Sequence, residues 1–418
     1  MSAKNLLIDA LRKNDEAKGK KANGYFETAK GAVCYSTGIP VLDYYVGYRT
    51  NVYDEDDNII DSYNSLGFSG GTIVTIIGKP STAKTSSLMK YAANIVRRFD
   101  NGFILHWDLE RSTLNYTRIQ ALTKFRMSEI KNGKYILRKE KLSLDQMKAS
   151  LYEIYEEKTS NKDKYIYDTG RKNEFGDEIY EYQPTVVILD SIGAITVGAN
   201  GDDLAKMEEV SSQTDRMRLT AYISRFFNEI MDVLSGANIM LFCVNQLKTA
   251  SATNSFLHRA ADMPYLSPDE TMPGGKGPTY AYSILMKHIM PGSGKLTLED
   301  DGIEGNIMTV QIVKSRQSAA GRTFDLVYDK NKGISMLRTC IEYAKSNGLL
   351  GGNRAGYYFI DNKDHKFALK TCEEDFKNDP ELYKIMHDTI IPKLETNLTD
   401  IRPDDILIPE NEENFYDL

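Results

Sequence analysis

Cysteine is scarce in this sequence. The 418 residues include four cysteines, which lie far apart in the chain: Cys34, Cys243, Cys340 and Cys372. Their separation does not match the close pairs of a zinc site, and four are too few for a disulfide-rich scaffold in a chain of this length. The pattern indicates a reducing environment, which we expect to be the cytoplasm.

Long hydrophobic runs are also missing. No segment approaches the roughly 18 consecutive apolar residues that a membrane-spanning helix needs, and the first residues show no apolar signal-peptide core. Hydrophobic residues still make up 41% of the chain, which is enough for a large core and more than one domain. We therefore expect a globular protein without a membrane partner.

Positive charge is not in excess, since the formal net charge is −7. Much of the negative charge lies in residues 400–418, where seven carboxylates face the single Arg402. We treat this segment as an acidic tail. The remainder is close to neutral, so any surface that binds nucleic acid has to be local.

The most informative stretch runs from Gly71 to Ser87. Residues 72–77 form a short β-branched run that is typical of a buried strand. Residues 78–85 interrupt this pattern, and apolar residues then recur at helical spacing over 88–96. Strand, loop and helix in this order are the context of a phosphate-binding loop, because the start of a helix offers unpaired N–H groups to an anion.

In such a loop Lys84 reaches the β- and γ-phosphates of ATP, and the Thr85 hydroxyl binds Mg²⁺. The residues expected to contact the nucleotide are those of the loop itself: Gly78, Pro80, Ser81, Thr82, Ala83, Lys84, Thr85 and Ser86. Ala83 departs from the usual pattern, which has glycine at this position. Because a Cβ atom penalises a positive φ, we expect Ala83 to have a negative φ.

A second buried strand, residues 102–110, ends in the carboxylates Asp108 and Glu110. Ligands bind at the carboxyl ends of strands in open α/β sheets. Glu110 is the candidate general base that orients a water molecule against the γ-phosphate; the alternative is a solvated strand end or a helix N-cap. We expect His106 and Trp107 to pack rather than react.

Two further apolar strands end in polar side chains. Residues 186–190 close with Asp190, the form of strand whose aspartate holds Mg²⁺ in nucleoside triphosphatases. Residues 238–246 close with Asn245 and Gln246, whose amides can hydrogen-bond a γ-phosphate or its water without adding charge. The alternative for Gln246 is a cap on the strand end.

The alternation of buried strands with helical stretches predicts an α/β fold with a mostly parallel central sheet. We divide the chain into an N-terminal helical arm (1–33), a core (34–335) and a small C-terminal α+β domain (336–399) that precedes the tail. Polar stretches at 49–67 and 124–182 predict surface insertions on the core. The apolar stripe of the arm predicts docking, either on its own core or on a neighbouring copy.

The motifs, in the order in which they follow one another along the chain, resemble those of the RecA/UvsX recombinase family over roughly residues 34–360. The segments that carry the resemblance are Ser36-Thr37-Gly38 with Leu42-Asp43, the 78–85 loop, Asp108-Leu109-Glu110, Leu189-Asp190-Ser191, Asn245-Gln246, Gly274-Gly275 and Lys314-Ser315-Arg316. Arg316 stands where the family has lysine. Together with Ala83 and the two insertions, this departure indicates a divergent, phage-like member, which would act in the cytoplasm of a bacterial host.

The resemblance implies a RecA-like ATPase core whose ATP hydrolysis depends on DNA. It implies a helical filament on single-stranded DNA that pairs with double-stranded DNA and exchanges strands, with ATP between subunits. Glu110 would be the catalytic carboxylate and Gln246 the sensor of the γ-phosphate. Lys314 and Arg316 would reach the ATP of the adjacent subunit. Tyr116 would stack on adenine, although its alignment needs a one-residue gap.

The resemblance also implies two DNA-binding loops, near 198–218 and 248–276. Their candidate contact residues are Arg216, Arg218, Lys248, His258, Arg259, Gly274, Gly275 and Lys276. Neither loop is net basic, so charge permits DNA binding without supporting it. The alternative for Lys248 and Arg259 is that they are solvated loop residues.

Two other function classes fit the same motifs. One is a RecA-type ring helicase or another DNA-dependent motor, which forms a closed ring instead of an open filament. The other is an ATP-switched assembly protein with vestigial hydrolysis, against which Glu110 argues.

Overall fold

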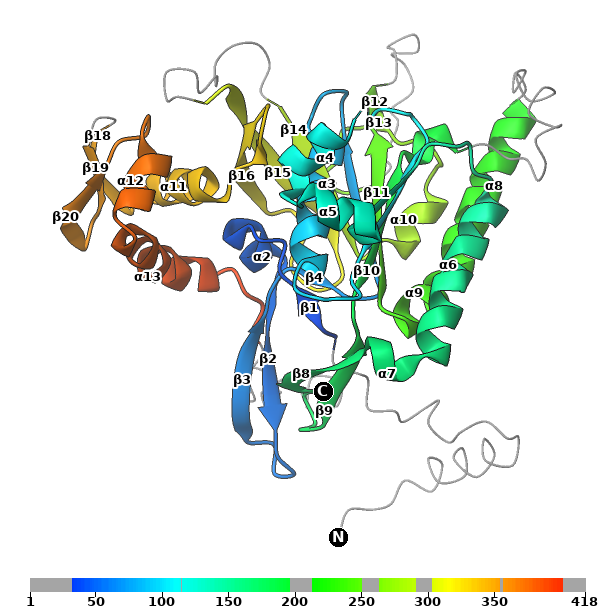
Figure 1. Cartoon of the computed structure of the whole chain (residues 1–418), viewed down its shortest axis with the longest axis horizontal. Helices are drawn as coiled ribbons and strands as arrows, with labels where there is room; N and C mark the ends of the chain where they lie inside the picture. The colour runs from blue at the N-terminus through cyan, green and yellow to red at the C-terminus, as the bar shows by residue number, and fades with distance from the viewer. Residues whose placement is uncertain are drawn as a thin grey trace, which may run out of the picture.

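A mixed α/β fold surrounds a nine-stranded sheet in the computed structural model of the chain (Figure 1). The structure describes residues 32–113, 115–195, 213–249, 263–290, 303–353 and 356–400. The strands of the sheet, in spatial order, are β17 (Gly333–Ile334), β16 (Thr323–Asp329), β15 (Gly305–Ser315), β14 (Ile284–Ile289), β5 (Ile73–Gly78), β11 (Ile239–Gln246), β10 (Thr185–Asp190), β6 (Ile104–Asp108) and β7 (Tyr135–Arg138). Neighbours from β14 to β7 are parallel, and those from β14 to β17 are antiparallel. The prediction of a mostly parallel central sheet is therefore confirmed.

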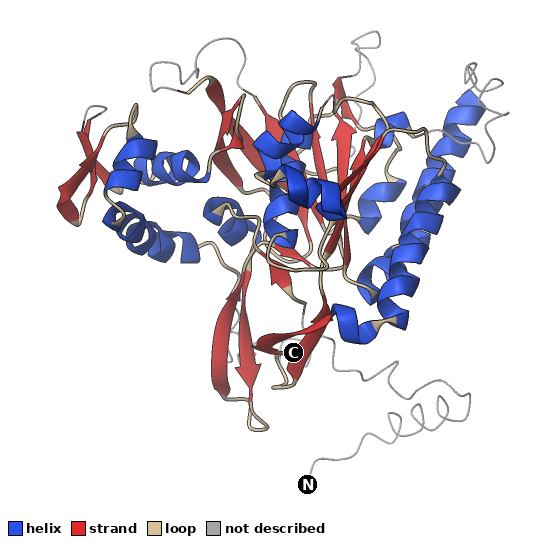
Figure 2. Ribbon diagram, in the orientation of Figure 1, coloured by secondary structure: helices blue, strands red, loops and turns tan. Residues whose placement is uncertain are grey.

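Helices cover both faces of this sheet (Figure 2). Val74 and Ile76 of β5 face the layer that contains α2 (Pro40–Val46), α3 (Lys84–Val96) and α11 (Met336–Ser346). Ile73 and Ile77 face the layer of α6 (Leu144–Ser160), α8 (Gln213–Glu229) and α9 (Met231–Gly236). Burial on both faces explains why the central strands are apolar without alternation.

The stretch 124–182 is more than a surface insertion. It begins in the turn after α4 (Tyr116–Thr123) and includes α5 (Met127–Glu129) and a π-helical turn, Ile130–Lys134. Its strand β7 pairs with β6 at the edge of the central sheet, and α6 packs against α9 on one face. The short helix α7 (Lys162–Tyr165) and the hairpin of β8 (Ile166–Lys172) and β9 (Glu178–Tyr182) extend beyond the central sheet, although Ile179 of β9 is buried in the core.

The stretch 49–67 forms a second hairpin, from β2 (Tyr48–Tyr53) and β3 (Ile59–Ser65). The two hairpins lie side by side (Figure 1). The Tyr53 amide donates to the Glu174 carbonyl at 3.0 Å, and the Tyr63 hydroxyl donates to the Lys172 carbonyl at 2.8 Å. A short ladder of β1 (Cys34–Tyr35) and β4 (Phe68–Ser69) connects the hairpins to the core.

Residues 336–400 add a smaller unit beside the antiparallel edge of the sheet. It consists of α11, a three-stranded sheet and two further helices: β18 (Leu350–Asn353), β19 (Gly356–Phe359), β20 (Asn362–Phe367), α12 (Cys372–Asn378) and α13 (Glu381–Glu395). The helix α11 packs on β16, α2 and α13, so this unit shares the core of the larger layer.

Several predictions fall outside the described residues. These are most of the arm (1–31), most of the first DNA loop, His258 and Arg259 of the second, and the tail beyond Asp400. Within the described ranges, no helix has both the length and the apolar character that crossing a membrane requires.

Candidate active site

Four neighbouring parallel strands, β5, β11, β10 and β6, end side by side, and the polar residues at their carboxyl ends meet along one side of the sheet, which we call its carboxyl edge. Asp190 of β10 is in register with Asp108 of β6 and Val244 of β11, and Gln246 of β11 is in register with Gly78 of β5. A cavity of about 610 Å³ opens at this edge. Its lining residues are Pro80, Ser81, Thr82, Ala83, Lys84, Thr85, Ser86, Glu110, Ser112, Asp190, Val244, Gln246, Met290, Asn306, Tyr328 and Lys330.

The 78–85 loop wraps one side of this cavity before α3 begins at Lys84. The Lys84 ammonium donates to the carbonyls of Gly78 (3.1 Å) and Lys79 (2.7 Å). Burial lowers the pKa of Lys84, and the negative charges of Asp190 and Glu110 oppose this shift. The side chain is therefore a partly desolvated cation next to two carboxylates, and an anion in the cavity would gain from its charge.

The expected negative φ of Ala83 is wrong. Ala83 has φ 55° and ψ 21°, the left-handed conformation, as the N-cap of α3. The loop has to turn sharply to start the helix, and the Cβ atom costs roughly 1–2 kcal/mol in this conformation. The Ala83 carbonyl accepts the Ser87 amide at 2.9 Å and the Ser87 hydroxyl at 2.8 Å, which helps to hold the strained residue in place.

Asp190 and Thr85 contact each other across the cavity floor. The Thr85 hydroxyl donates to Asp190 Oδ2 at 2.6 Å. The pKa of Asp190 is raised to about 6, mainly by burial and also by the carboxylates of Glu110 and Asp108, while the Thr85 hydrogen bond and the Lys84 charge oppose the shift. Hydroxyl and carboxylate oxygens are the ligands that Mg²⁺ prefers. Asp190 also belongs to a buried group with His106 and Asp108, in which one potential ligand atom from each residue lies within 4.8 Å of the others.

The raised pKa of Asp190 predicts pH-dependent binding of a divalent cation. A carboxylate must lose its proton to bind the metal, so Mg²⁺ affinity should be constant above pH ~6 and weaken about tenfold per pH unit below it. The measurement is Mg²⁺ affinity of the protein–nucleotide complex between pH 5 and pH 8. Asp190→Asn is the control, because it retains only the pH dependence of the nucleotide itself. Equal pH dependence in both proteins would contradict the prediction.

Glu110 is exposed at the end of β6, where the chain turns toward the cavity. Its Oε1 atom accepts hydrogen bonds from the Ser191 hydroxyl and from Gln246 Nε2, the latter at 3.2 Å. The amides of Leu109 and Glu110 both donate to the Asp190 carbonyl, at 2.7 and 3.2 Å. Three strands thus hold the carboxylate in one position. The role of Ser191 was missed, because a serine after Asp190 has no local signal of a partner 81 residues away.

Asp108 has a structural role. Its carboxylate accepts the amides of Ser112 (2.9 Å) and Thr113 (2.8 Å) and so holds the turn after β6. His106 is fully buried, with Nδ1 2.7 Å from the Tyr135 hydroxyl. Burial lowers the pKa of His106 to about 4, so the ring is neutral at pH 7. Trp107 is also fully buried, and the expectation that His106 and Trp107 pack is confirmed.

The antiparallel strands contribute a wall that the sequence did not reveal. Asn306 of β15 and Tyr328 of β16 are register partners and line the cavity together with Lys330. The Tyr328 hydroxyl accepts a hydrogen bond from Arg118 Nη2 at 3.1 Å, which fixes the ring. Tyr116, the residue expected to stack on adenine, begins α4 with 50% of its surface exposed and is not among the lining residues.

Lys314 and Arg316 lie at the opposite end of the strands, where the parallel strands β5 and β14 begin. The register pairs Ser315 with Ile284, at the start of β14, whereas the cavity lies at the end of β5 and β14. The Lys314 ammonium donates to the carbonyls of Thr279 (2.6 Å) and Tyr280 (3.2 Å) in the short helix α10 (Gly277–Ala281). The Arg316 guanidinium also donates to the Tyr280 carbonyl. Neither residue reaches the cavity of its own chain.

The described candidates for DNA contact lie near the carboxyl end of β11. Lys248 is exposed on β12 (Lys248–Thr249), which pairs with β13 (Glu270–Thr271), and Lys276 is exposed before α10. Arg216 and Arg218 belong to α8; Arg218 is exposed, and the Arg216 side chain lies outside the described part.

Gly274 and Gly275 both have positive φ, 86° and 71°. A Cβ atom on Gly275 would lie 2.6 Å from the Thr220 side chain of α8. Backbone conformation and close packing therefore account for the glycine pair without a ligand.

A comparison with models of known protein families gives no match for this chain, and a comparison with curated proteins gives none either.

Proposed function

We propose that the chain is an ATP-dependent DNA recombinase of the RecA/UvsX type. It binds ATP and Mg²⁺, assembles as a helical filament on single-stranded DNA in the cytoplasm, and pairs that strand with double-stranded DNA. The observation that carries the proposal is the convergence of Lys84, Thr85, Asp190, Glu110 and Gln246 around one cavity. These are the residue types that nucleoside-triphosphate hydrolysis requires, in the order and on the strands that the motifs predicted.

Each residue has a role in this reaction. The loop amides and the Lys84 ammonium bind the phosphates, and Thr85 and Asp190 hold Mg²⁺, which neutralises phosphate charge. Glu110 accepts a proton from, or orients, the attacking water. Since Gln246 donates to Glu110, its amide is placed to report the state of the γ-phosphate to the segment that follows β11.

The position of Lys314 and Arg316 supports a shared active site. Two cations at the sheet edge opposite to the cavity can act on a nucleotide only from another copy of the chain. In a filament they would approach the γ-phosphate of the neighbouring subunit and stabilise the charge that develops there, as an arginine finger does. In the isolated chain they stabilise the C-terminal carbonyls of α10.

Tyr328 is the residue that we expect to contact the base of ATP. An aromatic ring that lines the cavity offers a stacking face. Tyr328→Ala should raise the KM for ATP about tenfold, the equivalent of a lost stacking contact of ~1.4 kcal/mol. Tyr328→Phe should stay near the parent value because it keeps the ring. The matched control is Tyr116→Ala, which should have little effect; the reverse order of the two alanine variants would restore Tyr116 as the stacking residue.

The proposal as a whole is tested by ATP turnover with and without single-stranded DNA, with electron micrographs of the same samples. DNA-stimulated turnover together with helical filaments is the expected result, and strand exchange is then the next assay. Closed rings with DNA-stimulated turnover would indicate a helicase. Nucleotide-dependent assembly without turnover would indicate a switch protein. Turnover that DNA does not change would reject the recombinase proposal.

A further inference from the structure

A second cavity, of about 330 Å³, lies between β1, the C-terminal part of α3 and the β8 strand. Its lining residues are Val33, Cys34, Tyr35, Ser36, Asn64, Leu66, Asn94, Ile95, Arg98, Phe99, Tyr167, Thr169 and Arg171. The helix α3 runs from Lys84 in the first cavity to Val96 near the second, so the two cavities lie at opposite ends of this helix. No role in ATP hydrolysis accounts for the second one.

Arg171 contributes an uncompensated cation to this cavity. Its Nη1 atom is buried and has no hydrogen-bond partner among the described residues. Its guanidinium lies 4.9 Å from the centre of the Tyr63 ring, which holds the side chain in place. No carboxylate in the described part of the chain forms an ion pair with Arg171. Arg171 as a whole is partly buried, so the cost lies in the one buried N–H group that has no acceptor, and a bound anion would supply that acceptor.

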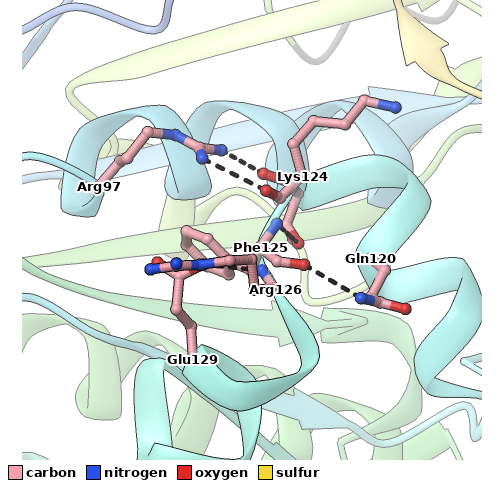
Figure 3. Close-up of polar contacts among 7 residues, drawn as sticks. Arg97, Gln120, Lys124, Phe125, Arg126 and Glu129 are labelled. Atoms are coloured by element: carbon pink, nitrogen blue, oxygen red, sulfur yellow. Dashed lines mark hydrogen bonds and ion pairs between the residues drawn. The ribbon is translucent and has the colours of Figure 1, made fainter.

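Arg98 adds a second positive charge. It is exposed on the cavity rim, and the described residues provide it with no hydrogen bond or ion pair. The preceding residue shows the contrast. The Arg97 guanidinium donates to the carbonyls of Thr123 and Lys124 and lies 5.1 Å from the Phe125 ring (Figure 3). Arg97 is therefore held by hydrogen bonds within the fold, whereas Arg98 has only an electrostatic attraction to the Asp43 carboxylate.

A pair of hydroxyl groups supplies a further unused donor. The hydroxyls of Tyr35 and Tyr167 are 3.0 Å apart, and Asn238 Nδ2 donates to the Tyr35 hydroxyl. Two hydroxyl hydrogens are available in this pair, and one is enough for the bond between them. No hydrogen bond from the second hydrogen to a described residue is formed, so this pair can donate one further hydrogen bond.

The charge of the lining favours an anion. The lining residues include two arginines and neither aspartate nor glutamate. The C-terminal end of α3 carries a partial negative charge of about half a unit, which two guanidinium groups outweigh. Two carboxylates lie near the wall. Asp43 accepts hydrogen bonds from Ser36 and Thr37 and is 3% exposed. The second is Glu181, whose charge acts on the hydroxyls of Tyr35 and Tyr167; burial and this charge raise their pKa.

We propose that this cavity binds an oxyanion of the phosphate type, held by Arg171 and Arg98. Planar guanidinium groups match the geometry of phosphate oxygens and make charge-assisted hydrogen bonds with them. The phosphate can belong to a small molecule or to the backbone of a nucleic acid. The site does not depend on ATP binding in the first cavity.

The test is calorimetric titration of inorganic phosphate into the full-length chain. Every protein in the series carries Lys84→Ala, which weakens phosphate binding at the first cavity. One saturable site is expected in this parent protein, with affinity at least about tenfold weaker in Arg171→Met and in Arg98→Met. Arg126→Met is the matched control, because Arg126 is an exposed arginine whose side chain pairs with Glu129 elsewhere on the surface (Figure 3).

Affinity within twofold of the parent in Arg98→Met, or in an Arg171→Met protein that melts at the parent temperature, would overturn the proposal. So would the absence of a saturable site. Arg98 is exposed, so its variant keeps the test available if Arg171→Met does not fold. A fluorescent single-stranded oligonucleotide, titrated into the same variants, distinguishes the sources. A parallel loss of affinity identifies backbone phosphate as the ligand, and unchanged affinity identifies a small phosphate compound.

Discussion

Replacing Glu110 with glutamine should lower ATP turnover at least about a hundredfold and leave nucleotide affinity within a few-fold of the parent. Glutamine has the same size and keeps an oxygen that accepts from Ser191 and Gln246, so the local structure should persist. The amide cannot take a proton from water, and only the chemical step should fail. Single-turnover kinetics with a fluorescent ATP analogue separate binding from hydrolysis.

Glu140→Gln is the control for this experiment. Glu140 is an exposed carboxylate that pairs with Arg138 beyond β7, so the substitution removes one negative charge without touching the cavity. Its turnover should equal that of the parent. Unchanged turnover in Glu110→Gln would show that Glu110 is not the base, whereas a loss of ATP affinity would show that it acts in binding.

The second large effect concerns Lys314 and Arg316. A protein with both residues changed to methionine should lose DNA-stimulated turnover. A second protein with Lys84→Ala should lose it as well. An equimolar mixture of these two inactive proteins should recover activity. If each site combines Lys84 of one subunit with Lys314 and Arg316 of the next, about a quarter of the interfaces in a randomly mixed filament carry both intact sets, as expected for a heterologous interface. Turnover of the mixture relative to its separate components is the measurement.

A mixture of Lys84→Ala with Glu110→Gln is the matched control. Lys84 and Glu110 line the same cavity of one chain, so no interface in that mixture is intact and no recovery is expected. Melting curves are needed for the methionine variant, because Lys314 and Arg316 also bind the carbonyls of α10. A folded, co-assembled mixture without recovered turnover would contradict a shared active site.

Local patterns were sufficient to locate the end of the sheet that carries the candidate site. Residues 72–77, 186–190 and 238–246 could be recognised as buried strands, because both faces of a covered parallel sheet require apolar side chains. The polar residues that end these strands therefore had to meet at one edge, and Asp190, Glu110 and Gln246 do line one cavity with the 78–85 loop.

Conformations that oppose a residue's own preference could not be predicted in this way. Ala83 is left-handed although its Cβ atom disfavours this, because the loop geometry and the two hydrogen bonds to its carbonyl outweigh a local cost of roughly 1–2 kcal/mol. The short strand β7 lies in a polar stretch, and only its pairing with β6 makes it part of the sheet.

The sequence by itself determined which strands are buried, where the 78–85 loop lies and which carboxylates end beside it, since these properties depend on short-range periodicity. Tertiary structure alone decided that Tyr328 and not Tyr116 lines the cavity, that Ser191 supports Glu110, and that Lys314 and Arg316 lie at the far edge. Each of these depends on the order, direction and register of strands, including strands as distant in the sequence as β5 and β14, or on a contact between residues 81 positions apart. Residue spacing along the chain carries no information about such pairings.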